Sequence, residues 1–260
     1  MKRIFSLLLA LALSLSLCAC AAPAEKADDG KLQIVTTLFP YYDFARAIAQ
    51  DRADVTLLLS PGREAHSFEP TPLDAVTISE SDVFLYNGGE GEYWVDSMLG
   101  AAGENIAVVA CMMDYVDALD EEYVEGMQGA NSHDHDYEHG SHDAHDAHDD
   151  HDHDHEEDEH DSDEIEYDEH IWTSPKNAIV LCRAVCDAIC RADAENAAFY
   201  RANCENYCAQ LEDLDARFAA LCESAPRRLL IFADRFPMLY FCREYGLDYR
   251  AAFHGCSGDT

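Results

Sequence analysis

Positively charged residues are scarce in this chain of 260 residues, where 17 Lys and Arg stand against 52 Asp and Glu and give a formal charge of −35. A protein that binds nucleic acid by neutralising phosphates is therefore excluded, and the charge argues against docking on anionic lipid through a basic patch. The sequence also lacks any hydrophobic run long enough to cross a membrane, because its one long apolar run, near the N-terminus, is too short. We expect no nucleic-acid partner and no spanning helix in the body of the chain.

Cysteine is abundant, with 11 residues, but no CxxC pair is present, so neither a disulfide framework nor a zinc ribbon is predicted. Cys182, Cys186 and Cys190 recur every four residues, and Cys204 and Cys208 repeat that step. This spacing places them on one face of a helix, where we expect them to serve as small apolar core residues. A thiolate metal site on the same stripe is the alternative.

The N-terminus has the form of a secretion signal. Met1-Lys2-Arg3 is a short positive region, and the apolar run that follows is too short to span a membrane. It closes on Leu17-Cys18-Ala19-Cys20, which resembles a bacterial lipobox with Cys20 as the lipidated residue. We expect residues 1–19 to be a signal peptide and 20–31 a lipidated tether, giving an extracytoplasmic protein anchored to the bacterial cell membrane. The alternative is an ordinary cleaved signal.

Strand and helix patterns alternate along the chain, which predicts an α/β fold with a parallel sheet covered on both faces. The expected strands are 32–37, 55–59, 83–86, 106–109, 229–232 and 247–253, and the expected helices are 40–49, 72–79, 93–99, 175–191, 194–223 and 237–244. Ligands of such sheets bind beyond the carboxyl ends of the strands.

A low-complexity tract interrupts this pattern over 126–168. It contains ten of the thirteen His among many acids and carries no hydrophobic period, so we expect a disordered loop. The lobe before it would span 32–125 and resume over 169–193. A helix of some thirty residues over 194–225 would link it to a second lobe that begins at 226 and is incomplete at 260, which suggests a truncated sequence. On this helix we expect Phe199, Ala202, Leu211, Leu214, Phe218 and Leu221 to be buried.

Two His lie outside the tract in loops that are expected to meet at the sheet edge. His66 follows the second strand and His170 precedes a helix. Neutral imidazoles at such an edge are natural ligands for Zn²⁺. The segments PGREAHSFEPTPLD, YNGGEGEYW and DEHIWTSPKNA resemble the signature stretches of the cluster-A, zinc-uptake type of solute-binding lipoproteins of ABC importers, also called adhesion lipoproteins. The resemblance covers about 32–260. It implies two (β/α) lobes joined by a rigid helix, a metal between them, and His66 and His170 as ligands.

The third ligand implied by the family is a His after the first strand of the second lobe, but the sequence there reads IFADRFPMLY. Alignment without a gap places Arg235 at that position, which cannot bind a cation. A one-residue insertion places Asp234 there, and we favour Asp234. The alternatives are that Asp234 caps the next helix or that only two imidazoles and water bind the metal. A fourth, acidic ligand would lie beyond Thr260, and we expect His254 on the surface.

The resemblance implies a monomer that catalyses no reaction, captures Zn²⁺ and delivers it to a membrane permease. The alternatives are a Mn²⁺-binding component of the same type of transporter and a stand-alone zinc buffer or chaperone. The tract would act as a weak, labile auxiliary metal-binding loop, because it places many imidazoles and carboxylates within mutual reach. Its ten imidazoles are His133, His135, His139, His142, His145, His148, His151, His153, His155 and His160.

Overall fold

The computed structural model describes residues 30–60, 62, 68–102, 105–127 and 166–255. In chain order the principal elements are β1 (Leu32–Thr36), α2 (Phe39–Ala49), β2 (Ala53–Leu57), α3 (Pro72–Ser79), β3 (Val83–Tyr86), α4 (Val95–Ala102), β4 (Val108–Cys111), α5 (Pro175–Ala192), α6 (Ala197–Ser224), β5 (Leu229–Arg235), α7 (Leu239–Tyr245) and β6 (Asp248–Phe253). Each expected strand and helix is confirmed within a few residues. In this part of the chain no helix is long and apolar enough to cross a membrane.

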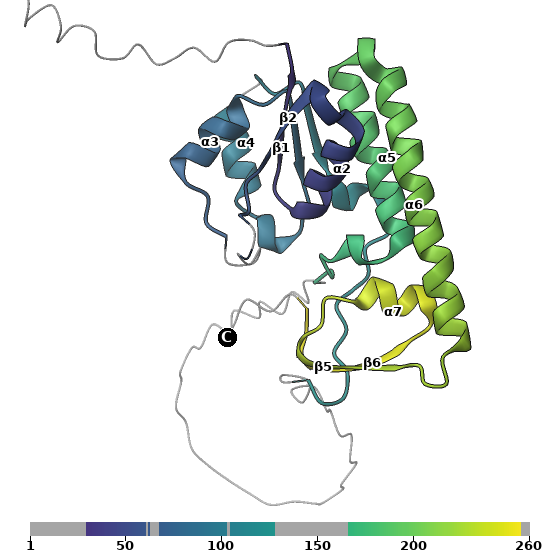
Figure 1. The fold of residues 1–260 in the computed structure, drawn as a ribbon. Coiled ribbons are helices and arrows are strands. Elements are labelled where there is room, and N and C mark those ends of the chain that lie inside the picture. Colours follow the sequence, from purple (N-terminus) through teal and green to yellow (C-terminus); the bar gives the residue numbers. More distant parts are fainter. Residues whose placement is uncertain (1–29, 61, 63–67, 103–104, 128–165, 256–260) are drawn as a thin grey trace, which may run out of the picture. The chain divides into compact units, whose positions relative to one another are not determined.

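The first sheet has the strand order β2-β1-β3-β4, and all of its strands are parallel. Successive side chains of a strand point to opposite faces. Ile34 therefore joins the core beneath α2, α5 and α6, whereas its neighbour Val35 joins a second cluster with Phe84 and Trp94. Figure 1 shows α3 and α4 on one side of this sheet and α2 and α5 on the other. The expected sheet with both faces covered is confirmed.

Local sequence signals fix where two of the helices begin. Thr71 and Asp74 form a reciprocal capping box at the start of α3, with Pro72 in its first turn. The Ser174 hydroxyl accepts a hydrogen bond from the Asn177 backbone N–H at the start of α5. Because α5 begins at Pro175, shortly after His170, this cap helps to fix the path of the chain that carries the His170 side chain.

The cysteine stripe is buried between α5 and α6, as expected. Cys182, Cys204 and Cys208 are at most 2% exposed, and their sulfur atoms lie 4.0 Å (Cys182–Cys204) and 3.9 Å (Cys204–Cys208) apart. The expected burial along α6 is wrong at Ala202 and at Leu221, which is 64% exposed. The buried positions of this helix are instead Tyr200, Cys204, Cys208 and Cys222.

Beyond α6 the chain forms a second parallel sheet, made of β5 and β6 in the described residues, with α7 between them in sequence. Its core contains Phe236, Leu239 and Tyr249, and Met127 from the other side of the tract packs into it. Gly246 ends α7 in the left-handed conformation, with φ of 59°. The two expected lobes are therefore present, joined by α6 (Figure 1).

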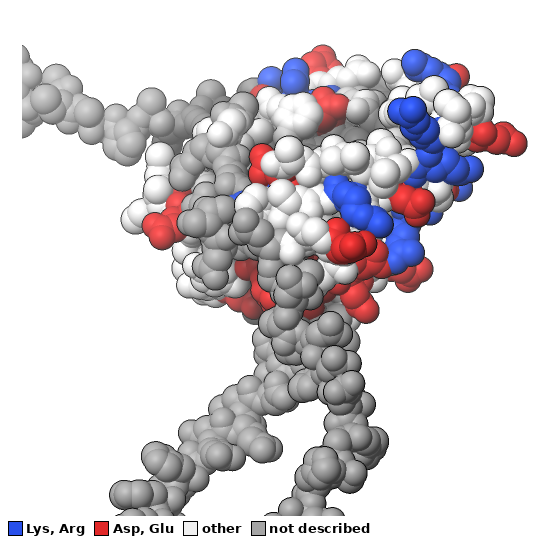
Figure 2. Space-filling model, turned by 90° about the horizontal axis from the view of Figure 1, so that it is seen from below, with Lys and Arg blue, Asp and Glu red and all other residues white. Residues whose placement is uncertain are grey.

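Basic side chains gather on the side of the molecule where α5 and α6 lie, and acidic side chains lie beside them (Figure 2). Arg183 of α5 lies 3.6 Å from the Glu212 carboxylate and 4.0 Å from that of Glu205, both on α6, and Lys176 pairs with Glu244. Exposed pairs of this kind contribute about 0 to 1 kcal/mol each.

One acid belongs to the core of the first lobe. Glu92 is 7% exposed, and its carboxylate accepts a hydrogen bond of 2.9 Å from the Gly88 backbone N–H, which holds the turn after β3. Burial raises the pKa of Glu92 from 4.5 to about 7. The folded chain therefore keeps a proton on Glu92 at pH values where the unfolded chain has lost it.

We expect the stability of the metal-free protein to fall between pH 4.5 and 7 because of Glu92, since the unfolded state gains from ionising it first. Glu92→Gln keeps an acceptor for Gly88 and removes this loss, so relative to wild type the variant gains about 3 kcal/mol across that range, at about 1.4 kcal/mol per pH unit. Urea unfolding at several pH values measures the difference. Glu90→Gln, at an exposed position in the same turn, is the control. Parallel pH profiles for wild type and Glu92→Gln would contradict the expectation.

Candidate metal site

The segment Asp168-Glu169-His170 lies just before α5. The Asp168 carboxylate is 2% exposed and accepts a hydrogen bond of 2.8 Å from the His170 backbone N–H. The same Oδ1 lies 3.1 Å from His170 Nδ1. A carboxylate accepts from an N–H, so this contact favours the tautomer with the proton on Nδ1 and the lone pair on Nε2. That is the state of a metal-ligating imidazole oriented by a neighbouring carboxylate.

Hydrogen bonds from both lobes hold the backbone of this segment. From α7, the Tyr240 hydroxyl donates to the Asp168 carbonyl oxygen at 2.7 Å and accepts from the Leu119 N–H at 3.0 Å. From the turn after β3, the Asn87 side-chain amide donates to the Glu169 carbonyl oxygen at 3.0 Å. His170 is thus placed relative to both sheets at once.

The Glu169 side chain turns back to the first lobe. Its Oε1 accepts a hydrogen bond of 2.7 Å from the Gly91 N–H, and burial raises the pKa of the Glu169 carboxyl. Gly89 has φ of 85°, and a Cβ at this position would lie 2.5 Å from Glu169 Oε1. The glycines of the YNGGEGEYW stretch therefore allow the turn after β3 to close against the segment that carries His170.

The carboxyl ends of β5 and β6, in the second lobe, face His170. Arg235 pairs with Phe253 after a register shift, so Asp234 and His254 lie at the same edge. A Cβ added to Gly255 would lie 3.4 Å from His170 Cε1 and 2.8 Å from the Phe236 carbonyl oxygen. The end of β6 therefore packs directly against the His170 ring.

Asp234 is exposed, and its Oδ1 accepts a hydrogen bond from the neighbouring Arg235 N–H at 2.9 Å. It does not cap the following helix, because α7 begins at Leu239 with Met238 as its N-cap. The alternative role that the sequence left open for Asp234 is therefore wrong.

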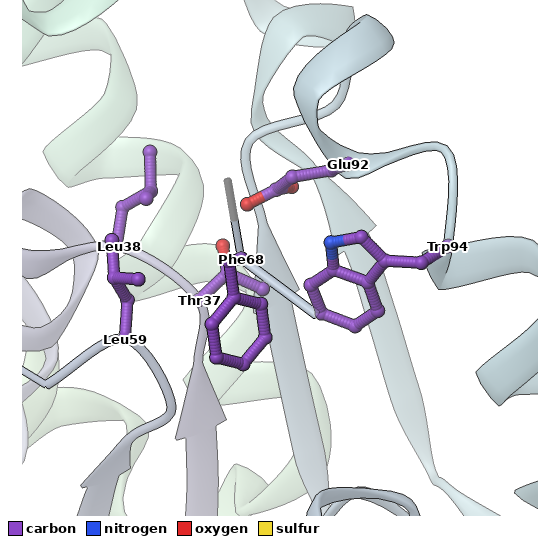
Figure 3. Close-up of a pocket in the computed structure, with 6 residues that line it drawn as sticks. All are labelled: Thr37, Leu38, Leu59, Phe68, Glu92 and Trp94. Atoms are coloured by element: carbon purple, nitrogen blue, oxygen red, sulfur yellow. The ribbon is translucent and has the colours of Figure 1, made fainter. Parts of the chain in front are cut away.

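A pocket is lined by Thr37, Leu38, Leu59, Phe68, Glu92 and Trp94 (Figure 3). Phe68 is 8% exposed and packs edge-to-face on Trp94, with ring centroids 5.4 Å apart. Among the described residues, Trp94 Nε1 and Glu92 Oε1 are buried without a hydrogen-bond partner. This pocket lies at the carboxyl ends of β1 and β2, where the sequence predicts the ligand to bind.

Several expected site residues lie outside the part of the chain that the structure describes. These are His66, Cys20 and the ten tract residues His133, His135, His139, His142, His145, His148, His151, His153, His155 and His160. Of the three expected metal ligands, His170 and Asp234 are described.

The expectation for His254 is wrong. Its side chain is 17% exposed, and its Nδ1 lies 2.7 Å from Glu121 Oε2, whose side chain is 3% exposed. Sequence reasoning also missed Asp168 and Tyr240. The position of Asp168, two residues before His170, is a sequence signal for a carboxylate that orients the imidazole. No local sequence signal predicts the contact of Tyr240, because the Asp168 carbonyl oxygen that it binds lies 72 residues away in the chain.

Two groups of three possible donor atoms within 4.8 Å of one another occur among the residues that the structure describes. Cys182, Cys204 and Cys208 form the first, inside the apolar core between α5 and α6. Spacings of about 4 Å are also those of packed neutral thiols, so the geometry fits the expected core role. The second group, Glu121, Glu166 and His254, lies where the tract leaves and rejoins the fold.

Comparison with known proteins identifies relatives along nearly the whole chain. The ZnuA family model, described as zinc-uptake complex component A, periplasmic, matches residues 34–260. The high-affinity zinc uptake system protein ZnuA of Bacillus subtilis is 32% identical over 217 residues, which cover 84% of this chain and 59% of that protein. The zinc-binding lipoprotein AdcA of Streptococcus pneumoniae strain R6 is 31% identical over 245 residues, 91% of this chain and 41% of that protein. The chain thus spans about half the length of these curated relatives.

Solved structures agree on the fold. The metal-dependent lipoprotein YcdH from Bacillus subtilis superposes with a TM-score of 0.64 at 28% identity, covering 85% of this chain and 67% of that one. The periplasmic zinc binding protein TroA from Treponema pallidum gives a TM-score of 0.67 at 21% identity, covering 88% and 69%, and at this identity shows the fold alone. Because the family model matches from β1 to the last residue, the chain belongs to the family of periplasmic zinc-uptake component A proteins.

Proposed function

We propose that this protein captures Zn²⁺ outside the cytoplasm and delivers it to an ABC-type metal importer. Zinc is the cargo of this process, and no chemical reaction is involved. The observation that carries the proposal is the Asp168–His170 pair, which is held by both lobes of a zinc-uptake family fold. An imidazole oriented in this way presents Nε2 to a cation with little further ordering, because its tautomer and ring position are already set.

His66 is proposed as the second ligand. Phe68 is anchored in the pocket at the carboxyl ends of β1 and β2. We infer that His66, which precedes Phe68 by two positions and so by at most about 7 Å of extended chain, supplies a ligand beside this pocket. It would therefore belong to the same sheet edge as the turn after β3, which is tied to Glu169.

Asp234 is proposed as the ligand from the second lobe. It is exposed at the carboxyl edge of β5, and the adjacent end of β6 packs on His170. Two imidazoles and one carboxylate form a donor set that suits Zn²⁺, and catalytic and transport sites commonly leave a further position open. Manganese prefers more oxygen ligands, so we propose that zinc is the favoured ion.

The His/Asp tract is proposed as an auxiliary, weakly binding loop. Near pH 7 its imidazoles are mostly neutral and can bind metal, and below about pH 6 they are protonated and release it. The described residues that flank the tract, 119–121 and 166–168, pair with each other and form its stem. The Asp168 N–H donates to the Leu119 carbonyl oxygen at 2.9 Å, and the Glu121 N–H donates to the Glu166 carbonyl oxygen at 2.8 Å. Ions held by the tract would therefore be concentrated near His170.

His170→Ala is expected to abolish tight zinc binding, because it removes a primary ligand. Asp168→Asn keeps the shape but not the charge that orients the ring, and should weaken zinc binding by about 10- to 100-fold. Competition calorimetry with Zn²⁺ and Mn²⁺ measures both effects and the order of the two ions. His139→Ala, in the tract, is the control that should keep the tight site. Unchanged affinity in His170→Ala, or Mn²⁺ bound more tightly than Zn²⁺ by wild type, would contradict the proposal.

Deleting residues 131–165 is expected to leave one tight zinc site and to remove several weak ones, since the tract supplies only labile donors. Equilibrium dialysis over a range of free zinc concentrations counts both classes. If the tight site is lost with the tract, the ligands proposed here have been misassigned.

Lipid attachment at Cys20 is proposed to anchor the protein to the membrane. Cys20→Ala should shift the protein from the detergent phase to the aqueous phase in detergent partition after expression in a bacterial host. Cys18→Ala is the matched control, because it leaves the acceptor thiol in place. A Cys20→Ala variant that still partitions with detergent would show that the anchor lies elsewhere.

A further inference from the structure

A stripe of cysteines lies between α5 and α6, which run side by side (Figure 1). Its members are all buried, and they are Cys182, Cys186 and Cys190 on α5 and Cys204 and Cys208 on α6. Ala, Val or Leu would fill an apolar helix interface as well as Cys does. Packing alone therefore does not explain why sulfur recurs at neighbouring positions on both helices.

Three of these thiols already have the spacing of metal ligands. The Cys204 sulfur lies 4.0 Å from that of Cys182 and 3.9 Å from that of Cys208, and all three sulfurs lie within 4.8 Å of one another. A zinc–thiolate bond is about 2.3 Å long, so two thiolates on one ion lie about 3.8 Å apart in a tetrahedral site and about 4.0 Å apart in a trigonal one. The thiols could share an ion after only small movements. Neutral thiols pack at a similar distance, so the spacing permits both states.

The hydrogen bonds of the stripe converge on one sulfur. Hydrogen bonds with the Cys182 and Cys186 thiols lower the pKa of Cys204, whereas the same hydrogen bonds raise the pKa of Cys182 and Cys186. The positive charge of Arg183 on α5 also lowers the pKa of Cys204. Cys204 is therefore the first thiol of the stripe to lose its proton, and the thiolate is the form of Cys that binds metal.

Two other buried cysteines show what a core thiol of this protein looks like. Cys222 on α6 is 7% exposed and Cys242 on α7 is 1% exposed. Among the residues that the structure describes, neither belongs to a group of three possible donor atoms. Burial raises the pKa of Cys242 to about 11, so this thiol stays protonated at neutral pH. Cys204 differs from them in having thiol donors on two sides and a cation nearby.

We propose that Cys182, Cys204 and Cys208 bind one divalent, thiophilic metal ion, Zn²⁺ in the cell, between α5 and α6. Cys186, whose thiol hydrogen-bonds to Cys204, is the donor for the fourth position of a closed structural site. A divalent ion cancels two thiolate charges in these apolar surroundings, whereas Cu⁺ would cancel only one. The ion would link α5, which begins shortly after His170, to α6, which joins the two lobes. Because the site is buried, the ion would enter as the chain folds.

The experiment uses the full chain, unfolded under reducing conditions and refolded with chelator-buffered Cd²⁺ as the probe. Cd²⁺ gives an ultraviolet charge-transfer band only when thiolates bind it, so imidazole and carboxylate sites are silent. We expect one Cd²⁺ with this band per wild-type chain, and a higher urea midpoint with Cd²⁺ than without it. Cys204→Ala and Cys208→Ala should each lose the band at a Cd²⁺ concentration that saturates wild type. Cys242→Ala is the matched control, a buried helical thiol whose loss should leave the band intact.

A measurement on wild type alone serves if a variant fails to fold. Zinc that remains in the purified protein after chelator treatment should have sulfur neighbours at about 2.3 Å in X-ray absorption. The importer site is distinguished by His170→Ala, which should keep the thiolate band while losing tight zinc capture. A wild-type chain without the band, a full band in Cys204→Ala, or a band with Cu⁺ but not with Cd²⁺ would overturn this proposal and leave the importer function intact.

Discussion

Hydrogen bonds from both lobes meet on the segment Asp168-Glu169-His170, and the site depends on this convergence. Tyr240 of α7 holds the Asp168 carbonyl oxygen, Asn87 at the end of β3 holds the Glu169 carbonyl oxygen, and Asp168 holds the His170 ring. A ligand side chain must be placed to within about 0.5 Å to be useful. Neither lobe alone fixes His170, so the position of this imidazole reports on how the two lobes are packed.

Carboxylates are concentrated around this segment. Asp168, Glu169 and Glu92 are buried, and the Glu121 side chain is 3% exposed. Burial raises the pKa of both Glu92 and Glu169, and repulsion from Glu169 adds to the rise of the Glu92 pKa. A divalent cation brought into this surrounding relieves repulsion that the fold otherwise sustains.

Much of the fold could be predicted from sequence, because alternating strand and helix patterns are local signals. β3 and α3 lie at the predicted residues, and Ser174 and Pro175 mark the start of α5. The burial pattern of α6 could not be predicted in the same way. This helix changes partners along its length: Tyr200 and Cys204 face the core with α2 and α5, whereas Phe218 contacts Phe241 and Tyr245 of α7. The helical period of the apolar residues predicts one buried face, but it does not predict which neighbouring element packs against each part of that face.

The site shows the same division between local and distant information. His170 was predicted from its own motif, and Asp168 lies two residues away from it. The sequence does not predict the contact of His254, because its partner, Glu121, lies 133 residues earlier in the chain. Tyr240 was missed for a similar reason. Such pairs form only where the two lobes pack against each other, and a single sequence does not show which residues are in contact there.

The place where the tract is inserted follows from the same geometry. For a flexible coil, which is what its composition predicts, each doubling of loop length costs only about 0.6 kcal/mol of closure free energy once the ends are held together. The stem holds those ends through the pairing of Glu121 with Glu166 and of Leu119 with Asp168. A long insertion is therefore inexpensive at this position. Asp168 belongs both to the stem and to the segment that carries His170. A tract inserted here would therefore keep its imidazoles at a high effective concentration near His170. A tract of any length inserted on the far side of the sheet would not have this high effective concentration.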